Sequence, residues 1–432
     1  MERITLIKKV LQELEKQGVR YCVLRNYNFL LEGRNEVWPS EKSVDMVVSR
    51  EDFNLFEKIM VDFSFLKRKP QFSRAHQAYF RIEELEPISF DVQVGGAHWN
   101  DMCYLDEKLI LGNRVKKLFF YIPGDNDTFI MLVAHSILGK RYFKKEYQEK
   151  ILQLASLIEV NYVRAQLHNI FNAKITGELL SLIQKNKFEK IMMRKEKYIL
   201  TFLLQKKRLF TFIPLALRWI RWKRFLQPYP LISIIGPDGA GKSTLVLELH
   251  EHLKRYKRKA QVVYTGRGRG QLLPFRKLGN AYKHREKQQD TKQPSSLWKR
   301  KIFYTAAAPL FALDLWLRYW LKIMPLRKCR TIVITDRYCT DILLIEHVPL
   351  WFKKFLFRLF PKPTMTFYLY NSAKVLHERR PKESIPELER QMQLFERMLP
   401  YLHARKIVTN EKEKVQEEVI ITVLEYIYKE WY

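Results

Sequence analysis

Short apolar runs alternate with longer amphipathic stretches through the second half of the chain. Short apolar runs are typical of strands buried on both faces, and apolar residues every three or four positions are typical of the helices that cover them. This order of elements predicts an α/β domain with a parallel sheet and helices on both of its faces. The predicted strands are Leu231–Ile235, Ala260–Tyr264, Thr331–Thr335, Thr366–Tyr370 and Lys406–Val408.

The first third of the chain mixes strands with amphipathic helices and predicts an α+β domain. Apolar residues recur within residues 4–14 at helical spacing, which predicts an amphipathic helix and not the apolar segment of a signal peptide. Asp91 alternates with apolar neighbours in a predicted strand at 88–94, so its side chain shares a face with that of Gln93. Other strands are predicted at 21–25, 43–48 and 78–82, and helices at 50–60, 146–159 and 164–188.

Two prolines, Pro228 and Pro230, separate the helical middle of the chain from the parallel-sheet domain, because proline ends a helix. We predict an α+β domain with a helical annex at 1–190, a basic amphipathic connector at 191–229 and the parallel-sheet domain at 230–432. The apolar blocks of the connector are shorter than the roughly 18 residues that a membrane span needs. Such a helix can lie on a membrane surface, but burial of its apolar face against the second domain is the favoured interpretation.

The segment from Gly236 to Ser243 reads GPDGAGKS and fits the spacing G-x-x-x-x-G-K-[ST]. It follows a predicted buried strand and opens a predicted helix, a context in which consecutive backbone N–H groups surround a phosphate group. The glycines let the backbone approach phosphate oxygens, the lysine reaches the β- and γ-phosphates, and the serine hydroxyl binds Mg²⁺. The predicted ATP-binding residues are Gly236, Gly239, Ala240, Gly241, Lys242, Ser243 and Thr244.

Asp336 and Arg337 directly follow the third predicted strand of the second domain. Ligands bind at the carboxyl ends of parallel strands, so both side chains are expected near the glycine-rich loop. We predict that Asp336 lies on the Mg²⁺ side of the site and that Arg337 contacts an acceptor phosphate, because a guanidinium binds phosphate in a bidentate manner.

Two further pairs of arginines are candidates for contacts with phosphate. Arg379 and Arg380 precede a break in a predicted helix, and we predict that they close over the transferring phosphoryl group, although a solvated charge run has the same pattern. Arg267 and Arg269 lie between glycines after the second strand. They are either part of an acceptor-binding cationic loop or an exposed basic turn.

Over residues 230–430 the chain resembles the thymidylate kinase family of P-loop nucleoside monophosphate kinases. The resemblance rests on GPDGAGKST, DRY, the strand that follows Pro363 and the ERR that ends a helix, in this order. It implies a phosphotransferase that uses ATP and Mg²⁺, with dTMP or a related phosphorylated molecule as the acceptor. It also implies that Asp238 contacts the acceptor sugar and that Arg337 binds the acceptor phosphate.

The chain departs from this family where the family recognises thymine. The segment after DRY reads CTDILL, and the helix that should carry an arginine and a glutamine for the base instead offers Asp314 and Arg318. The sequence therefore predicts intact phosphate-binding residues and does not specify the acceptor.

Residues 15–160 resemble nucleotidyltransferase-fold proteins. The resemblance rests on GVRYCVLRNYN, KSVDMVV, SFDVQV and IPGDNDTFIMLVAHSILGKRYFKK. It makes Asp45 and Asp91 the candidate ligands of a divalent metal. The family pattern has two acidic residues as D-x-D on the first of these strands, whereas this chain has Ser43 and Asp45. A degenerate or binding-only domain is therefore favoured over an active nucleotidyltransferase.

The chain carries 77 basic and 46 acidic residues, a formal net charge of +31. This charge favours polyanionic partners and leaves open an anionic membrane surface, nucleic acid or a phosphorylated substrate. A nucleotide-dependent binding protein at such a surface is the alternative to the kinase. The four cysteines lack the spacing of a zinc site or a disulfide framework. We expect a cytoplasmic protein, or one peripheral to the inner membrane face. The sequence leaves open whether the protein forms a homodimer.

Overall fold

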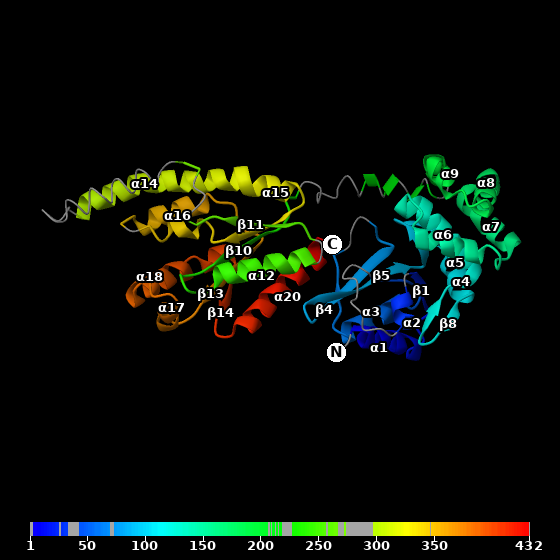
Figure 1. The fold of residues 1–432 in the computed structure, drawn as a ribbon, viewed down its shortest axis with the longest axis horizontal. Helices are drawn as coiled ribbons and strands as arrows, with labels where there is room; N and C mark the ends of the chain where they lie inside the picture. Colours follow the sequence, from blue (N-terminus) through cyan, green and yellow to red (C-terminus); the bar gives the residue numbers. More distant parts are fainter. Residues whose placement is uncertain are drawn as a thin grey trace. The chain divides into compact units, whose positions relative to one another are not determined.

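The computed structural model divides the chain into two units (Figure 1). Unit 1 comprises residues 1–223 and 423–432, and unit 2 comprises residues 224–422. The residues that the structure describes are 3–25, 27–32, 43–69, 73–205, 208, 210, 211, 213, 214, 216, 217, 227–255, 258–266, 272, 273, 297–345 and 347–431.

The sheet of unit 2 has five strands, all parallel, in the order β11-β12-β10-β13-β14 (Figure 1). The strands are β10 (Leu231–Ile235), β11 (Ala260–Tyr264), β12 (Ile332–Asp336), β13 (Met365–Tyr370) and β14 (Arg405–Val408). Every residue of β10 and β12 is buried, as expected for the central strands of a sheet covered on both faces. The prediction of a mixed α/β chain with a parallel sheet is confirmed.

Helices cover both faces of this sheet (Figure 1). The described helical segments of unit 2 are α12 (Lys242–Arg255), α14 (Leu297–Arg318), η3 (Tyr319–Ile323), α15 (Met324–Lys328), η4 (Cys339–Ile342), α16 (Leu350–Arg358), α17 (Ala373–Arg379), α18 (Ile385–Glu396), α19 (Leu399–Leu402) and α20 (Lys412–Glu430), whose residues from Val423 onward belong to unit 1. On one face, α12 buries Leu245, Leu249 and Leu253. On the other face, α14 and α16 share one core with Leu231 of β10 and Val333 of β12. Because β10 and β12 are neighbouring parallel strands, the loops that follow them lie at the same edge of the sheet.

The main sheet of unit 1 has the strand order β1-β2-β5-β4-β3, in which β2 and β5 are parallel and the other pairs are antiparallel. Its strands are β1 (Tyr21–Arg25), β2 (Val44–Val48), β3 (Leu66–Lys67), β4 (His76–Glu83) and β5 (Glu86–Val94). Two hairpins complete the strands of the unit: β6 (Gly96–Trp99) with β7 (Met102–Asp106), and β8 (Val115–Lys117) with β9 (Phe120–Ile122).

Side chains of β1 alternate between two cores of unit 1. Tyr21 and Val23 belong to one core, and Cys22 and Leu24 belong to the other, which is built mainly from helices. Among the described residues up to 203, the helical segments of this unit are α1 (Arg3–Lys16), α2 (Asn28–Glu32), α3 (Phe53–Asp62), α4 (Glu107–Gly112), α5 (Asp125–Ala134), η1 (His135–Lys140), α6 (Lys145–Leu154), α7 (Val160–Phe171), α8 (Ala173–Gln184), α9 (Phe188–Met193) and α10 (Lys195–Leu203).

The prediction of one helix over residues 164–188 is wrong. Asn172 adopts φ of +107° and ends α7, and its side chain accepts a hydrogen bond from the Ile175 N–H at 3.0 Å to begin α8. Asparagine both tolerates positive φ and caps helix N-termini, so a single residue divides a stretch whose apolar spacing is continuous. The predicted helix at 146–159 likewise ends early, at Leu154.

Candidate functional site

The segment after β10 forms a tight loop in which three glycines adopt positive φ. The values are +150° at Gly236, +82° at Gly239 and +84° at Gly241. A Cβ at Gly236 would collide with the Leu369 carbonyl oxygen, and one at Gly239 would lie 2.6 Å from that of Leu376. No described residue comes within 4 Å of a Cβ placed at Gly241. The loop is therefore packed on the sheet side and open at Gly241, an arrangement that suits a phosphate group.

Lys242 opens α12, and only 6% of its surface is exposed. Its Nζ donates to the Pro237 carbonyl oxygen at 2.7 Å and lies 3.7 Å from the Asp238 carboxylate. Burial, followed by repulsion from Arg337, lowers the pKa of Lys242 to about 8, although Asp238 opposes the shift. The ammonium group thus interacts with its own loop, through a carbonyl contact that a phosphate oxygen can replace.

Ser243 and Asp336 are brought together, as the sequence predicts. The Ser243 Oγ donates to Oδ2 of Asp336 at 2.6 Å, and Asp336 ends β12 in register with Ile234 of β10. Oδ1 of Asp336 is buried and has no hydrogen-bond partner in the described part of the chain. An unsatisfied buried carboxylate oxygen is costly, which makes this oxygen a candidate ligand for a cation.

The chemistry of this pair fits Mg²⁺. The ion prefers oxygen ligands and is usually held by one or two protein groups together with substrate phosphates and water. Among the described residues, no three His, Cys, Asp or Glu side chains gather into a metal cage. A site made from one hydroxyl and one carboxylate does not need such a cage.

Arg337 follows β12 with a left-handed backbone at φ of +70°, a conformation that side chains other than glycine rarely adopt. Its N–H donates to the Ile234 carbonyl oxygen at 3.0 Å. The guanidinium contacts the Asp238 carboxylate through Nη2, and Nη1 lies 3.4 Å from Oδ1 of Asp341. Burial alone would lower the pKa of Arg337, but the Asp341 and Asp238 carboxylates outweigh it and raise the pKa. Arg337 is therefore a fixed, permanently charged group beside the loop.

Two residues that hold Arg337 are missing from the sequence prediction. Asp341 lies in η4 and is 1% exposed. Thr265 follows β11, and its Oγ1 donates to the Arg337 carbonyl oxygen at 2.7 Å. Asp341 has a weak sequence signal, because it lies one helical turn after Arg337, whereas no pattern in the sequence marks Thr265.

Arg379 and Arg380 lie at the end of α17, and the structure gives them different surroundings. Arg379 donates to the Thr409 hydroxyl at 3.1 Å and to the Thr409 carbonyl oxygen at 2.6 Å. Arg380 is exposed, and its charge contributes to the lowered pKa of Asp238. Arg380 is thus within electrostatic range of the glycine-rich loop, whereas Arg379 is bound to the segment after β14.

Some predicted residues lie outside the part of the chain that the structure describes. They include Arg267 and Arg269 of the basic loop, and most of the connector between residues 206 and 226.

Asp314 and Arg318 form a buried ion pair on α14, and each has 0% of its surface exposed. Asp314 accepts hydrogen bonds from the N–H groups of Leu272 at 2.7 Å and Leu273 at 2.9 Å. Arg318 donates to the Gly266 carbonyl oxygen at 3.1 Å. The two side chains therefore anchor both flanks of residues 267–271 to α14.

In unit 1, Asp45 and Asp91 are opposite each other in the parallel pair β2–β5. The Asp45 carboxylate accepts hydrogen bonds from Nε of Arg25 and Oγ of Ser43, both at 2.8 Å. Oδ1 of Asp91 lies 3.8 Å from Nδ1 of His76. Burial alone would raise the pKa of Asp91, but His76 and Arg25 outweigh it and lower the pKa. The negative charge of this pair is therefore balanced by side chains of the protein, a role of Arg25 and His76 that the sequence did not predict.

No protein-family model matches this chain, and no curated protein matches it either. The resemblances described above therefore depend on the quoted residues alone, and the functional assignment depends on the geometry of the site.

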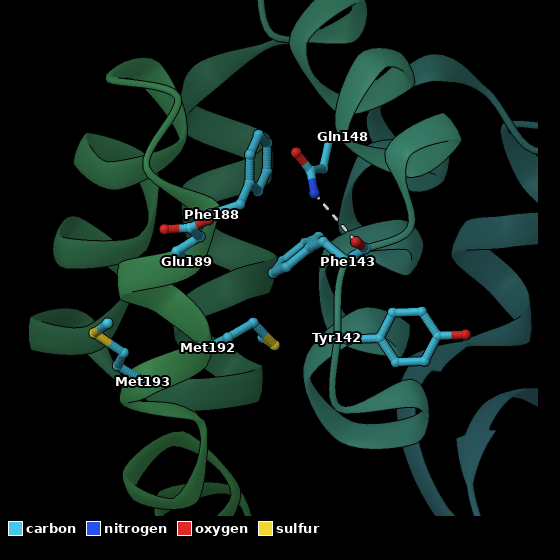
Figure 2. Close-up of a pocket in the computed structure, with 7 residues that line it drawn as sticks. All are labelled: Tyr142, Phe143, Gln148, Phe188, Glu189, Met192 and Met193. Atoms are coloured by element: carbon cyan, nitrogen blue, oxygen red, sulfur yellow. Dashed lines mark hydrogen bonds between the residues drawn. The ribbon is translucent and has the colours of Figure 1, made fainter.

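A cavity of about 480 Å³ lies in unit 1 and is mainly apolar (Figure 2). Its lining residues are Tyr142, Phe143, Gln148, Phe188, Glu189, Met192 and Met193. Figure 2 shows Gln148 turned to the Phe143 backbone, where its Nε2 donates to the carbonyl oxygen at 3.1 Å. The lining has one carboxylate and no cationic side chain, so this cavity does not suit a phosphorylated ligand.

Proposed function

We propose that unit 2 is a P-loop phosphotransferase that moves the γ-phosphoryl group of ATP, with Mg²⁺, to a nucleoside monophosphate or a related phosphorylated acceptor. The observation that carries this proposal is the convergence of Lys242, Asp336 and Arg337 around a glycine loop. They meet at the carboxyl ends of β10 and β12, two neighbouring parallel strands. This is the edge at which parallel α/β sheets bind ligands.

Lys242 and the loop backbone are the proposed binding groups for the β- and γ-phosphates. Lys242 exchanges the Pro237 carbonyl oxygen for phosphate oxygens, and the open side of Gly241 admits them. A buried ammonium placed beside the transferring group stabilises charge that develops in the loose transition state of phosphoryl transfer. We propose that Arg380, which is exposed and contributes to the lowered pKa of Asp238, closes over the transferring phosphoryl group.

Ser243 and Asp336 are the proposed Mg²⁺-holding residues. Ser243 supplies a hydroxyl and Asp336 supplies the oxygen that has no partner in the described protein. When bound, the ion would neutralise part of the negative charge of the phosphates.

Arg337 is the proposed contact for the acceptor phosphate. Asp238 and Asp341 hold its guanidinium from two sides, so its orientation is set before an acceptor binds. Asp314 and Arg318 are engaged with backbone groups of the loop after β11. Because they are so engaged, recognition of a thymine base by this helix has no support here, and the proposal names a phosphorylated acceptor without choosing the base.

Radiolabelled phosphoryl transfer by the purified full chain tests this function. The acceptor panel contains dTMP, the other nucleoside monophosphates and sugar phosphates, each with ATP and Mg²⁺. We expect a labelled product with at least one acceptor and its loss in Lys242→Ala, whereas Leu247→Ala on the exposed side of α12 retains it. If calorimetry detects no Mg²⁺–ATP binding by folded protein, the proposal is wrong.

For unit 1 we propose a binding role in place of metal-dependent nucleotidyl transfer. The support is the Arg25 guanidinium, which already interacts with the carboxylate that a metal would need. The test measures Mn²⁺ binding by electron paramagnetic resonance in the Asp336→Asn background, which removes the carboxylate of the proposed unit 2 site, alone and with Asp91→Ala added. Strong Mn²⁺ binding that Asp91→Ala abolishes would contradict a binding-only unit.

A further inference from the structure

The outward side of α14 is apolar. Its inner side packs Ala308, Ala312 and Leu315 into the core of unit 2, next to the buried Asp314–Arg318 pair. The exposed large apolar residues on α14 and its continuation η3 recur mostly at helical spacing, and they are Trp298, Ile302, Leu310, Leu313, Trp316, Trp320 and Leu321. A surface helix of a soluble domain normally has polar residues on its outer side. The outer side of α14 is therefore suited to an interaction with a partner or a membrane.

α16 extends this apolar surface. Trp351, Phe355 and Leu359 follow one another at four-residue spacing, and 71%, 55% and 56% of their surfaces are exposed. α14 and α16 contact each other, and their inner sides lie in one core on the same face of the sheet (Figure 1). Both helices therefore carry exposed apolar residues on the same face of the sheet. We name the exposed apolar residues of α14, η3 and α16 the α14–α16 face.

Basic residues are concentrated in the segments that form this face. Residues 297–330 contain eight Lys or Arg, of which Arg318 and Arg327 are buried, and a single acidic residue, Asp314, which is buried against Arg318. Residues 350–362 contain four Lys or Arg, of which Lys353 is buried, and no acidic residue. Lys301, Lys322 and Arg358 are exposed at positions beside the apolar side chains. The partner of this face must therefore be apolar in part and negatively charged in part.

An anionic lipid surface meets both requirements. Tryptophan and aliphatic side chains enter the boundary between headgroups and acyl chains, while lysine and arginine side chains reach lipid phosphates. A second copy would place two strongly basic surfaces against each other, which is unfavourable. Single-stranded nucleic acid could stack on the tryptophans but would leave Leu310, Leu313 and Leu321 in water.

We propose that the α14–α16 face docks unit 2 on an anionic membrane and lies in the interface without crossing it. None of the helices in the described residues is long and apolar enough to span a bilayer. This proposal does not depend on the phosphotransferase activity, because it uses the outer side of α14 and not the residues around the glycine loop.

The test measures co-flotation of the full chain with lipid vesicles. One set of vesicles is phosphatidylcholine alone, and the other contains about 30% of the anionic lipid phosphatidylglycerol. We expect binding only to the anionic vesicles, and weaker binding as NaCl is raised from 50 to 500 mM, because the electrostatic part is screened. The double variant Leu313→Glu/Trp316→Glu should bind at least about tenfold more weakly, which corresponds to about 1.4 kcal/mol. Leu247→Glu, at a more exposed leucine on α12, is the control and should bind nearly like the unchanged chain.

Three results would overturn the proposal. The first is vesicle binding that Leu313→Glu/Trp316→Glu leaves unchanged, or that Leu247→Glu reduces equally. The second is a dimer in light scattering that the double variant converts to a monomer, because a second copy then covers the face. The third is binding of single-stranded oligonucleotides, but not of vesicles, that the double variant abolishes. Folding of each variant is verified by circular dichroism and by ATP binding, which the double variant should retain.

Discussion

The Lys242 ammonium donates to the carbonyl oxygen of Pro237 at 2.7 Å, five residues earlier in the same loop. The contact leaves a buried positive charge with one neutral acceptor and the Asp238 carboxylate at 3.7 Å. Burial, followed by repulsion from Arg337, lowers the pKa of Lys242 to about 8, although the nearby carboxylates oppose the shift. The charge that the loop needs for phosphate binding is therefore sensitive to mildly alkaline pH.

We expect the affinity for Mg²⁺–ATP to fall as the pH rises above about 8, by up to about tenfold per pH unit. Phosphate binding favours the protonated lysine, so ATP binding near pH 8.5 should also take up a proton. Isothermal titration calorimetry in buffers of different ionisation enthalpy measures both effects. Lys242→Arg keeps its charge in this range and should remove the proton uptake. Equal affinity between pH 7 and pH 9.5 in the unchanged chain would contradict the assignment.

The lowered pKa also has a consequence for stability. The unfolded chain holds the lysine proton up to its ordinary value of 10.5, whereas the folded chain releases it near pH 8. Between these values the unfolded state binds more protons, so the contribution of Lys242 to stability increases with pH. Lys242→Met should remove this slope in urea unfolding measured from pH 8 to pH 10.

Asp336→Asn should separate stability from function. Loss of the charge removes the cost of the unpartnered buried Oδ1, so the free energy of unfolding without ligand should stay equal or rise by about 1 kcal/mol. Mg²⁺-dependent turnover should fall by roughly a hundredfold or more, because an amide is a poor ligand for the ion. Urea unfolding and a coupled kinase assay measure the two effects. A clear loss of stability of Asp336→Asn in magnesium-free buffer would contradict the proposal that Oδ1 of Asp336 is a cation ligand.

Gly236→Ala and Gly241→Ala should differ in their effects. Both residues have positive φ, which costs an alanine about 1–2 kcal/mol. At Gly236 the added Cβ also collides with the Leu369 carbonyl oxygen. We therefore expect the free energy of unfolding to fall by about 4 kcal/mol or more, the size typical of severe steric strain. At Gly241 the methyl group would lie in open space, so the variant should fold and lose ATP binding. Thermal unfolding followed by calorimetry distinguishes them, and similar melting temperatures for both variants would contradict this difference.

Arg318→Met should destabilise unit 2 by about 3–5 kcal/mol, because it leaves the fully buried Asp314 carboxylate without its cation. The double variant Asp314→Leu/Arg318→Met removes both charges and should recover much of this loss. Arg358→Met, on the exposed side of α16, is the control and should change stability by about 0.5 kcal/mol or less. If chemical denaturation gives the same midpoint for Arg318→Met and Arg358→Met, the pair is not a structural anchor.

The parts of the fold that follow from the sequence are those with a strong local pattern. β10 and β11 have the bounds expected from their apolar runs. β10 is buried along its whole length, whereas β11 is a half-buried edge strand whose limits are marked by its run of apolar residues. The hairpin β8–β9 has three exposed residues in its first strand, so its sequence contains no apolar run that predicts a strand there. Asn172 ended a helix whose apolar spacing continued beyond it.

The candidate site shows the same limit. The glycines and Lys242 have a local spacing with a mechanism, and that spacing predicts the shape of the loop. The contact of Arg379 with Thr409 joins residues 30 positions apart, and the contact of Arg25 with Asp45 joins neighbouring antiparallel strands. Such partners are set by tertiary packing, so no spacing in the sequence points to them.

The anchors on α14 attach the segment after β11 through its backbone. Arg318 donates to the Gly266 carbonyl oxygen, and Asp314, one helical turn away, accepts from the N–H groups of Leu272 and Leu273. Because these hydrogen bonds use backbone atoms, they depend on Asp314 and Arg318 and not on the identity of the side chains at positions 272 and 273. The attachment should therefore tolerate changes of these two leucines other than to proline, whereas the loss of either charged residue should release one flank.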